Sequence, residues 1–216
     1  MVKSPMPDAD VATQDRILEA AHRVFLRRGV AAARTQEIAD EAGVNKALLH
    51  YYFQTKEGLA DAVFLRAAAG LFPQLLGALA SDLPLRQKLQ AAIDTEMGAL
   101  EGDPFLPGYI LCELRTDPAR LSALLHETLP VEQVRAQVFG VLQAQIDAEV
   151  AAGRLRPITS QQLVVTLMSL LLFPHAAAHM LQVAAGLGAD AQAALSNWRR
   201  ETLADFVLRG FAPDPA

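Results

Sequence analysis

Residues 34–57, RTQEIADEAGVNKALLHYYFQTKE, constrain the fold of this chain most strongly, because they predict two short helices joined by a tight turn. The first helix begins at Thr35, whose hydroxyl can cap free backbone N–H groups, and ends at Gly43, which tolerates the left-handed conformation of a helix C-cap. The second helix begins at Asn45, another capping residue, and extends to Phe53. Because only two residues separate the helices, they must cross steeply, as in a helix-turn-helix.

The second of these helices has an apolar half and an outward half on a 3.6-residue wheel. The outward half combines a cation, a small residue that lets the backbone approach closely, an imidazole and a phenol. Such a set suits the major groove of DNA and the phosphates at its edges. The apolar half holds Leu48, Leu49, Tyr52 and Phe53, and the outward half holds Lys46, Ala47, His50 and Tyr51.

The distribution of charge is compatible with nucleic acid, although the 216-residue chain carries a net charge of −5. Residues 1–66 hold nine Lys or Arg and nine Asp or Glu, whereas the remaining residues hold ten and fifteen. The acidity therefore lies outside the helix-turn-helix third, where a local positive field can meet phosphates. We expect this field from Arg27 or Arg28, Arg34, Lys46 and Lys56.

The environment of the chain is predicted to be the cytoplasm. Its single cysteine, Cys112, excludes an intramolecular disulfide and fits a reducing compartment. The first residues contain no apolar signal sequence, and we expect them to form a short disordered arm.

The N-terminal domain is predicted over residues 12–72, with the helix-turn-helix at residues 34–53. Before the motif, residues 13–28 show apolar positions at three- and four-residue steps and should form a supporting helix that ends at Gly29. After the motif, Thr55 can cap a linking helix, which places Lys56 in its first turn and within reach of a phosphate.

Pro73 should kink or end the linking helix, because proline removes a backbone donor and clashes with the preceding turn. The second domain is therefore expected over residues 73–216, which show no strand-like alternation and no repeat. Asp-Pro pairs, a capping box at Thr159 and Gln162, and glycines delimit its helices. We expect helices over residues 84–102, 105–115, from 119 to Pro130, 131–152, from 160 onward, and 191–209.

The segment LVVTLMSLLLF at residues 163–173 is apolar nearly all round the helix. A membrane span is an alternative, but eleven residues cover only about half of a bilayer's hydrocarbon core, and polar residues follow at once. The better interpretation is a helix buried by the protein's own core and by a second subunit. We therefore expect no membrane, and a homodimer formed through the last two helices.

The motif region resembles the DNA-binding domain of the tetracycline-repressor (TetR) family of bacterial transcription regulators. The resemblance covers about the first third of the chain, from Thr13 onward. It rests on the pattern IA-x2-AGV-x4-L-x2-YF-x2-KE-x-L, which is Ile38, Ala39, Ala42, Gly43, Val44, Leu49, Tyr52, Phe53, Lys56, Glu57 and Leu59.

This resemblance implies an all-α fold of about nine helices in all. A three-helix helix-turn-helix domain, with its third helix in the major groove, would precede a helical-bundle ligand-binding and dimerisation domain. Leu48 and His50 depart from the common pattern, which has threonine and tyrosine there, and this puts a hydroxyl-to-phosphate contact at each position in doubt. By position, the residues that would face base edges are Gln36, Lys46, Ala47 and Tyr51. The residues that would contact phosphates are Thr35, His50 and Lys56. Asn45 would cap the recognition helix beside them.

The resemblance also implies a small-molecule effector in the C-terminal domain. Residues that could line its pocket are mostly aromatic or sulfur-bearing and carry few charges, which indicates an apolar or weakly polar ligand. Taken singly, each of them is better explained as ordinary core than as a ligand contact. The set comprises Phe72, Met97, Phe105, Tyr109, Cys112, Phe139, Met168, Phe173 and His175.

No motif indicates catalysis, and we expect no cofactor and no enzyme activity. His175 and His179 stand four residues apart, which is the spacing of a metal-binding pair, but no third ligand is evident. Packing in a core or interface is the favoured role for both, so no metal is expected.

The sequence thus predicts a cytoplasmic, homodimeric regulator that represses transcription, binds a palindromic operator in double-stranded DNA and is released by a small molecule. The alternative is a helical ligand- or partner-binding module that keeps the bundle but has lost DNA binding.

Overall fold

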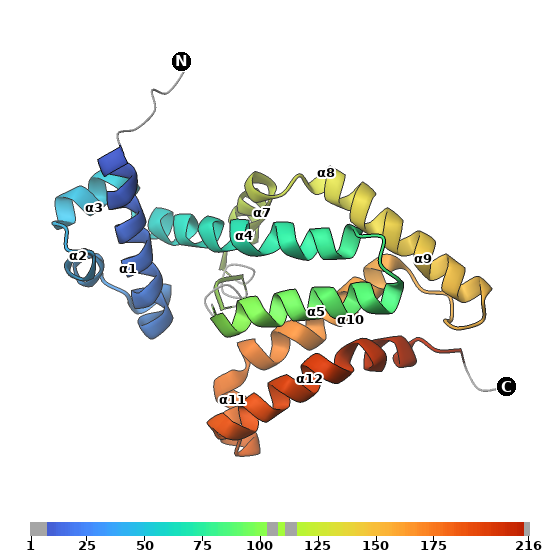
Figure 1. The fold of residues 1–216 in the computed structure, drawn as a ribbon. Coiled ribbons are helices and arrows are strands. Elements are labelled where there is room, and N and C mark those ends of the chain that lie inside the picture. The colour runs from blue at the N-terminus through green and yellow to red at the C-terminus, as the bar shows by residue number, and fades with distance from the viewer. Residues whose placement is uncertain (1–7, 103–107, 111–115, 214–216) are drawn as a thin grey trace. The chain divides into compact units, whose positions relative to one another are not determined.

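The computed structural model describes residues 8–102, 108–110 and 116–213, which are helical with short connections and contain no strand (Figure 1). The predicted all-α class is therefore confirmed. Contacts divide the chain into two compact units, Met1–Ala68 and Ala69–Ala216, and the division falls inside one helix, shortly before Pro73.

The N-terminal unit consists of three helices and the beginning of a fourth. They are α1 (Asp8–Ala32), α2 (Thr35–Ala42), α3 (Lys46–Phe53) and α4 (Lys56–Ala80). The expected apolar stripe of α1 is completely or almost completely buried, and it meets buried residues of the other three helices. This core holds Ile17, Ala20, Ala21, Val24 and Phe25 from α1, with Ile38, Ala39, Leu49, Leu59, Val63 and Phe64.

The first helix begins earlier than expected, because residues from Asp8 onward, which were predicted to be a disordered arm, already belong to α1. Gly29 interrupts the helix with φ 71° and ψ 156°, as its predicted role as a stop requires. A further short turn follows before α2.

The caps of the helix-turn-helix agree with the sequence at two of three positions. Gly43 is left-handed, with φ 65°, and the Asn45 side chain accepts a hydrogen bond from the Leu48 N–H at 2.7 Å. Thr35 does not cap α2, since the N-cap position belongs to Arg34, which makes no side-chain cap bond.

The C-terminal unit is a bundle in which α5 packs against α12, α10 and α9 (Figure 1). Its buried core takes residues from all four of these helices and from the end of α4. The elements are α5 (Leu85–Gly102), α7 (Pro118–Thr128), α8 (Val131–Val134), the π-helical η1 (Arg135–Phe139), α9 (Gly140–Ala151), α10 (Ser160–Ala176), α11 (Ala178–Ala185) and α12 (Ala189–Gly210).

Local capping signals fixed several of these boundaries as predicted. The Asp117 side chain accepts a hydrogen bond from the Arg120 N–H at 3.0 Å, with Pro118 in the first turn. Thr159 and Gln162 form the expected reciprocal capping box at the start of α10. The helix expected over residues 131–152 is divided by η1, and the expected pair Asp103-Pro104 lies outside the described residues.

Pro73 neither ends nor delimits α4, which continues to Ala80. A proline inside a helix costs about 3 kcal/mol. The turns around it bury Leu71, Leu75 and Leu79, and each buried leucine contributes about 1.5–3 kcal/mol. Apolar packing therefore outweighs the lost backbone bond.

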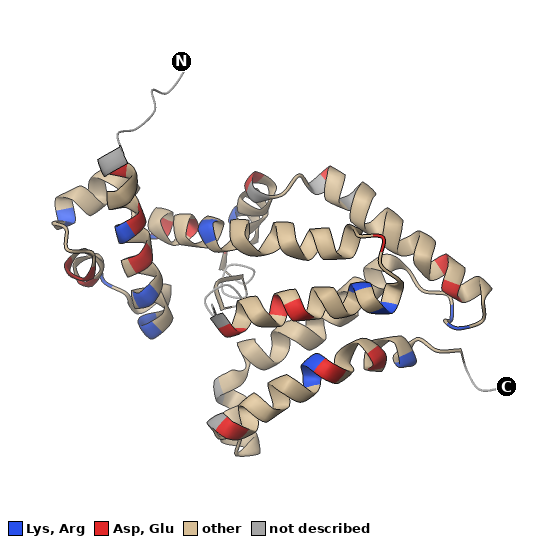
Figure 2. Cartoon of the chain, viewed as in Figure 1, with Lys and Arg blue, Asp and Glu red and all other residues tan. Residues whose placement is uncertain are grey.

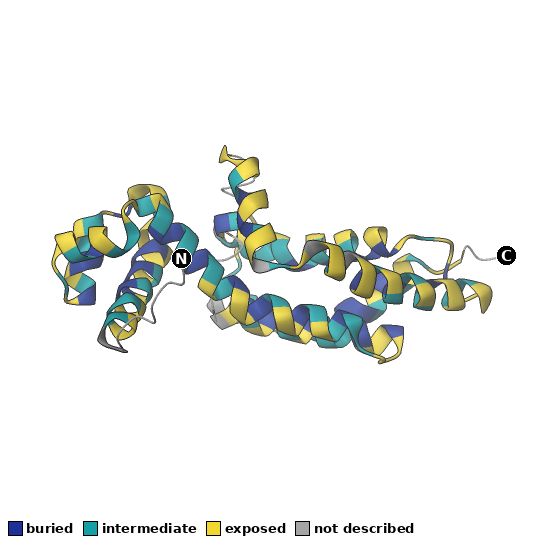
Figure 3. Ribbon diagram, turned by 90° about the horizontal axis from the view of Figure 1, so that it is seen from above, coloured by how far each residue is buried: buried dark blue, intermediate teal, exposed yellow. Residues whose placement is uncertain are grey.

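The apolar helix α10 carries no Asp, Glu, Lys or Arg, as Figure 2 shows. Leu163, Leu167 and Leu171 are buried in the core of the unit, whereas Val165 and Phe173 are exposed. Along the whole chain, most helices show such a buried side and an exposed side (Figure 3).

One described helix, α4, is long and apolar enough to cross a membrane by length and composition, with 33% of its most apolar window buried. This criterion is also met by core helices of proteins that do not enter membranes.

Candidate nucleic-acid interface

The outward half of α3 is exposed as predicted. Lys46, Ala47 and His50 are exposed, and Tyr51 is 76% exposed. Leu49 anchors the opposite side in the core at 3% exposure, while the other predicted core residues of this helix are half-buried. Because the Asn45 cap fixes the start of α3 and Leu49 fixes its rotation, the four outward side chains share one surface.

A phenol hydrogen bond joins α3 to α1. The Tyr52 hydroxyl donates to Asp10 at 2.8 Å, and this bond to the carboxylate raises the pKa of Tyr52. The Tyr51 ring meets the Tyr52 ring edge to face, with centroids 5.2 Å apart. Sequence reasoning missed Asp10 because it was assigned to the arm.

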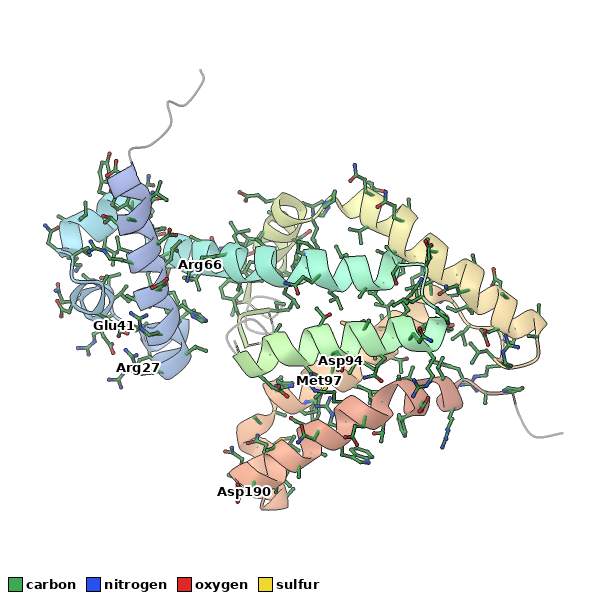
Figure 4. All side chains as sticks on the ribbon, in the orientation of Figure 1. Arg27, Glu41, Arg66, Asp94, Met97 and Asp190 are labelled. Carbon is green, nitrogen blue, oxygen red and sulfur yellow. The ribbon has the colours of Figure 1, made fainter. Side chains whose placement is uncertain are left out.

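Acidic residues of α2 form ion pairs with arginines of α1. Glu41 accepts from Arg23 at 2.7 Å and also from Arg27, with both Arg27 and Glu41 labelled in Figure 4. Arg28 lies 3.5 Å from Glu37. The bonds from Arg27 and Arg23 lower the pKa of Glu41 to about 2. The positive field expected from Arg27 or Arg28 is thus largely balanced by these carboxylates.

Lys56 connects the start of α4 to the end of α1. Its Nζ donates to the backbone carbonyls of Ala31 at 2.8 Å and Ala33 at 3.2 Å. Two of its three N–H donors are thereby engaged. Thr55 caps α4 as expected, since its hydroxyl accepts a hydrogen bond from the Gly58 N–H at 2.9 Å.

The two remaining candidates lie at the start of α2. Thr35 is half-buried and Gln36 is exposed. The Gln36 amide donates to Asp40, one turn later, at 2.7 Å. This hydrogen bond joins two exposed side chains, so the Gln36 amide could leave Asp40 and bind another polar group.

The described candidate pocket residues differ in burial, and two of them line hollows. Met97, labelled on α5 in Figure 4, and Tyr109 are buried, whereas Phe72, Phe139 and Met168 are half-buried. Phe105 and Cys112 lie outside the described residues. Phe173 and His175 line two adjoining hollows, described next.

These hollows lie between the end of α10 and α12. A cavity of about 470 Å³ is lined by residues of α10, α11 and α12 and by Glu101, and His175 and Arg199 are among its walls. A neighbouring groove of about 430 Å³ is more apolar and includes Phe173, Trp198 and Phe206. Pro174 and Arg199 contribute to both hollows.

Buried charges near the cavity were missed from the sequence. Glu96 on α5 is 3% exposed, and burial raises its pKa to about 7 against the effect of Arg199. Arg199 on α12 is 7% exposed. Charged residues at single helix positions usually lie in solvent, so no local signal could have identified these two.

Three metal ligands do not meet anywhere in the described residues. His175 ends α10 and His179 belongs to α11, with the non-helical Ala177 between them. The two histidines therefore do not share one helix, contrary to the expectation from their spacing.

Comparison with known proteins identifies the N-terminal part. Residues 17–63 match the model of the family described as bacterial regulatory proteins, tetR family. This part of the chain is therefore similar to the N-terminal region of TetR-family regulators. The matched residues extend from the middle of α1 to the first turns of α4, so they include the whole helix-turn-helix.

Curated relatives match less than half of the chain. The HTH-type transcriptional activator FasR of Mycolicibacterium smegmatis is 39% identical over 88 residues, which are 41% of this chain and 40% of FasR. The HTH-type transcriptional repressor KstR2 of Rhodococcus jostii is 31% identical over 85 residues, 39% and 42% of the two chains. The chain therefore spans less than half the length of these relatives.

Solved structures share the fold over nearly the whole chain. The hemolysin II transcriptional regulator HlyIIR is 20% identical with a TM-score of 0.60, covering 95% of this chain and 99% of its own. FadR from Bacillus subtilis, solved in complex with stearoyl-CoA, is 19% identical with a TM-score of 0.60, covering 88% and 97%. At these identities the likeness concerns the fold alone.

Proposed function

We propose that this protein is a cytoplasmic transcription regulator of the TetR family that binds a palindromic operator as a homodimer and represses transcription until a small molecule releases it. The observation that carries the proposal is the exposed quartet Lys46, Ala47, His50 and Tyr51 on α3. A cation and two hydrogen-bonding rings around a small residue match the requirements of a helix lying in the major groove.

The quartet and its neighbours have separate roles in this proposal. Lys46, Ala47 and Tyr51 face base edges together with Gln36, whose amide leaves Asp40 for a base. Thr35, His50 and Lys56 contact phosphates, and Asn45 holds the start of α3 at the DNA surface. Lys56 keeps its two carbonyl partners and offers its remaining N–H to a phosphate oxygen.

The decisive experiment compares two single-charge variants. A DNA site is first selected from a random pool with the wild-type protein and then titrated in gel-shift assays. We expect Lys46→Ala to weaken operator binding more than tenfold, because it removes a direct contact. Arg209→Ala removes the same charge from an exposed position on α12 and should change affinity less than twofold.

Circular dichroism should show both variants folded like the wild type. If Lys46→Ala binds the selected site as tightly as wild type, the assigned role of α3 is wrong. If the wild-type protein selects no DNA and is not retained on non-specific DNA at low salt, the protein is instead a helical ligand- or partner-binding module that has lost DNA binding.

Support for the dimer comes from exposed apolar side chains on α10 and α12. Phe173, Trp198 and Phe206 are each more than half exposed and line the apolar groove, with Val165 farther along α10. Contiguous exposed apolar residues of this size mark an interface, and a second copy of the same face would bury them symmetrically.

Release by a ligand follows from dimer geometry. Two recognition helices can enter successive major grooves only if they lie about 34–36 Å apart. A ligand that prefers another separation lowers DNA affinity by its differential affinity for the two states. FadR from Bacillus subtilis, which shares the fold, was solved in complex with stearoyl-CoA, and this supports the proposal of a ligand-responsive regulator.

Repression is the direction proposed here, although the relatives include an activator and a repressor. A reporter whose promoter overlaps the selected operator tests it. Expression should fall when the protein is present and recover when Lys46→Ala replaces the wild type.

A further inference from the structure

Arg199 is a buried cation that forms no salt bridge within the described part of the chain, although the carboxyl of Glu96 lies near enough to act on it electrostatically. Its side chain belongs to a residue that is only 7% exposed, and its Nη2 donates to the backbone carbonyls of Leu170 and, at 3.4 Å, Leu171. Carbonyl oxygens satisfy hydrogen-bond donors but do not neutralise a full charge. Burial of an uncompensated charge costs several kcal/mol, so this guanidinium requires an explanation.

Pro174 accounts for the position of the guanidinium. A proline has no N–H, so the carbonyl of Leu170, four residues earlier in α10, loses its helical partner. Arg199 donates to that carbonyl from α12 and is held against α10. A guanidinium has five N–H donors, and the donors outside Nη2 stay available for a second partner.

The acidic residues nearby do not balance this charge. Burial raises the pKa of Glu96 to about 7, so a large fraction of its carboxyl groups is neutral at pH 7, and its Oε2 has no hydrogen-bond partner in the described residues. Glu101 accepts a hydrogen bond from Arg200 at 2.9 Å. Burial also lowers the pKa of His175, which favours the neutral ring. The surroundings of Arg199 are therefore net positive.

The cavity of about 470 Å³ gives access to Arg199. Its wall combines this cation with Leu181 of α11, Leu195 of α12 and Leu187 in the connection between the two helices. Gln192, Ser196 and Asn197 add neutral hydrogen-bonding groups. A cavity with apolar walls and one charged group binds small molecules that have one apolar part and one charged end.

We propose that this cavity binds an amphipathic monocarboxylate, whose carboxylate pairs with the Arg199 guanidinium and whose apolar body lies against Leu181, Leu187 and Leu195. The planar guanidinium matches a carboxylate with two parallel hydrogen bonds. A single uncompensated cation favours one negative charge, and Glu101 in the wall disfavours further charges. The inference rests on the proposed ligand-binding role of the C-terminal unit and names the chemical class of its ligand.

Calorimetric titration with three matched probes tests the charge preference. Decanoate, decan-1-ol and decylammonium share one chain length and differ in the charge of the polar end. Below their micellar concentrations, the wild-type protein should bind decanoate at least tenfold more tightly than either other probe. Equal or weaker binding of decanoate would overturn the proposal.

Variants then place the site. Arg199→Gln keeps an N–H donor for the freed carbonyl but removes the charge, and it should bind decanoate at least tenfold more weakly while binding decan-1-ol as the wild type does. Arg209→Gln removes the same charge elsewhere on α12 and should change neither affinity. If Arg199→Gln binds decanoate as tightly as wild type, the guanidinium is not the anchor.

Two more variants cover the case in which Arg199→Gln does not fold. Ala193→Trp fills the cavity from its α12 side while keeping the Arg199 side chain, and it should abolish decanoate binding. Glu96→Gln removes the buried carboxyl that competes for Arg199, so at pH 8 it should bind decanoate more tightly than wild type does. Unchanged decanoate binding in both variants would refute the assignment of the ligand to this cavity.

These measurements contain no DNA, so the two proposals can fail separately. If decanoate does not bind but Lys46→Ala still loses operator affinity, the carboxylate site is wrong and DNA binding stands. If decanoate binds as described but leaves operator affinity unchanged, the site stands and ligand release is wrong.

Discussion

Glu41 accepts hydrogen bonds from two guanidinium groups at the surface between α1 and α2, and these bonds add to the apolar contacts that join the two helices. The bonds from Arg27 and Arg23 lower its pKa from 4.5 to about 2, so the folded state favours the ionised form. Its stabilisation is fully present above pH 4.5 and is lost as the pH falls through about 2. Because the group lies near solvent, screening reduces the effect well below what the pKa alone suggests.

We therefore expect Glu41→Gln to lower the free energy of unfolding by about 1 kcal/mol at pH 7, measured by urea denaturation. Glu19→Gln makes the same charge change at an exposed position on α1 and should leave stability nearly unchanged. Equal effects of the two substitutions would show that the change in net charge, and not the loss of the hydrogen bonds from Arg23 and Arg27, lowers the stability.

At the scale of elements, α5 presents a carboxyl of Glu96 to the interior beside α12. Burial raises its pKa to about 7 from 4.5, so the folded state favours the protonated form. For an acid shifted in this direction, stability increases as the pH falls through 7 and the gain is complete below 4.5. His175 has its pKa lowered by burial and opposes this trend below about pH 6.5.

The prediction is that the wild-type protein is more stable to urea at pH 6.5 than at pH 8. Glu96→Gln should be more stable than wild type at pH 8, by up to about 3 kcal/mol, and should lose most of the pH dependence in this range. A wild-type stability that stays constant or rises from pH 6.5 to pH 8 would contradict a buried protonated carboxyl.

At the scale of the whole molecule, the proposed function requires two copies of the chain, and the exposed apolar face of α10 and α12 is the proposed contact. We expect Phe206→Glu to convert the dimer to a monomer in sedimentation-velocity runs, because a charge would have to be buried at the centre of the interface. Operator affinity should then fall more than tenfold, since one half-site is held alone.

Val183→Glu is the matched control, because Val183 is 75% exposed on α11 and lies in neither of the two hollows. It should remain a dimer with wild-type DNA affinity. A Phe206→Glu protein that sediments as a dimer would place the interface elsewhere.

The sequence by itself determined the features that depend on neighbours within a few residues. The left-handed Gly43, the Asn45 cap, the capping box at Thr159 and the stop at Gly29 follow from backbone chemistry that acts over one turn. The outward set on α3 follows from helical periodicity, and the resemblance to the TetR family follows from fixed spacing over the same stretch.

Only the tertiary structure decided which polar groups lie inside and what they contact. Lys56 reaches carbonyls more than twenty residues earlier in the chain, Arg199 satisfies a carbonyl freed by Pro174, and Glu96 is enclosed by helices distant in sequence. The continuation of α4 beyond Pro73 likewise depends on tertiary packing, because the leucines around it are buried against other helices. Burial and ion pairing depend on contacts between segments far apart in the chain, and local sequence patterns do not encode which segments will meet.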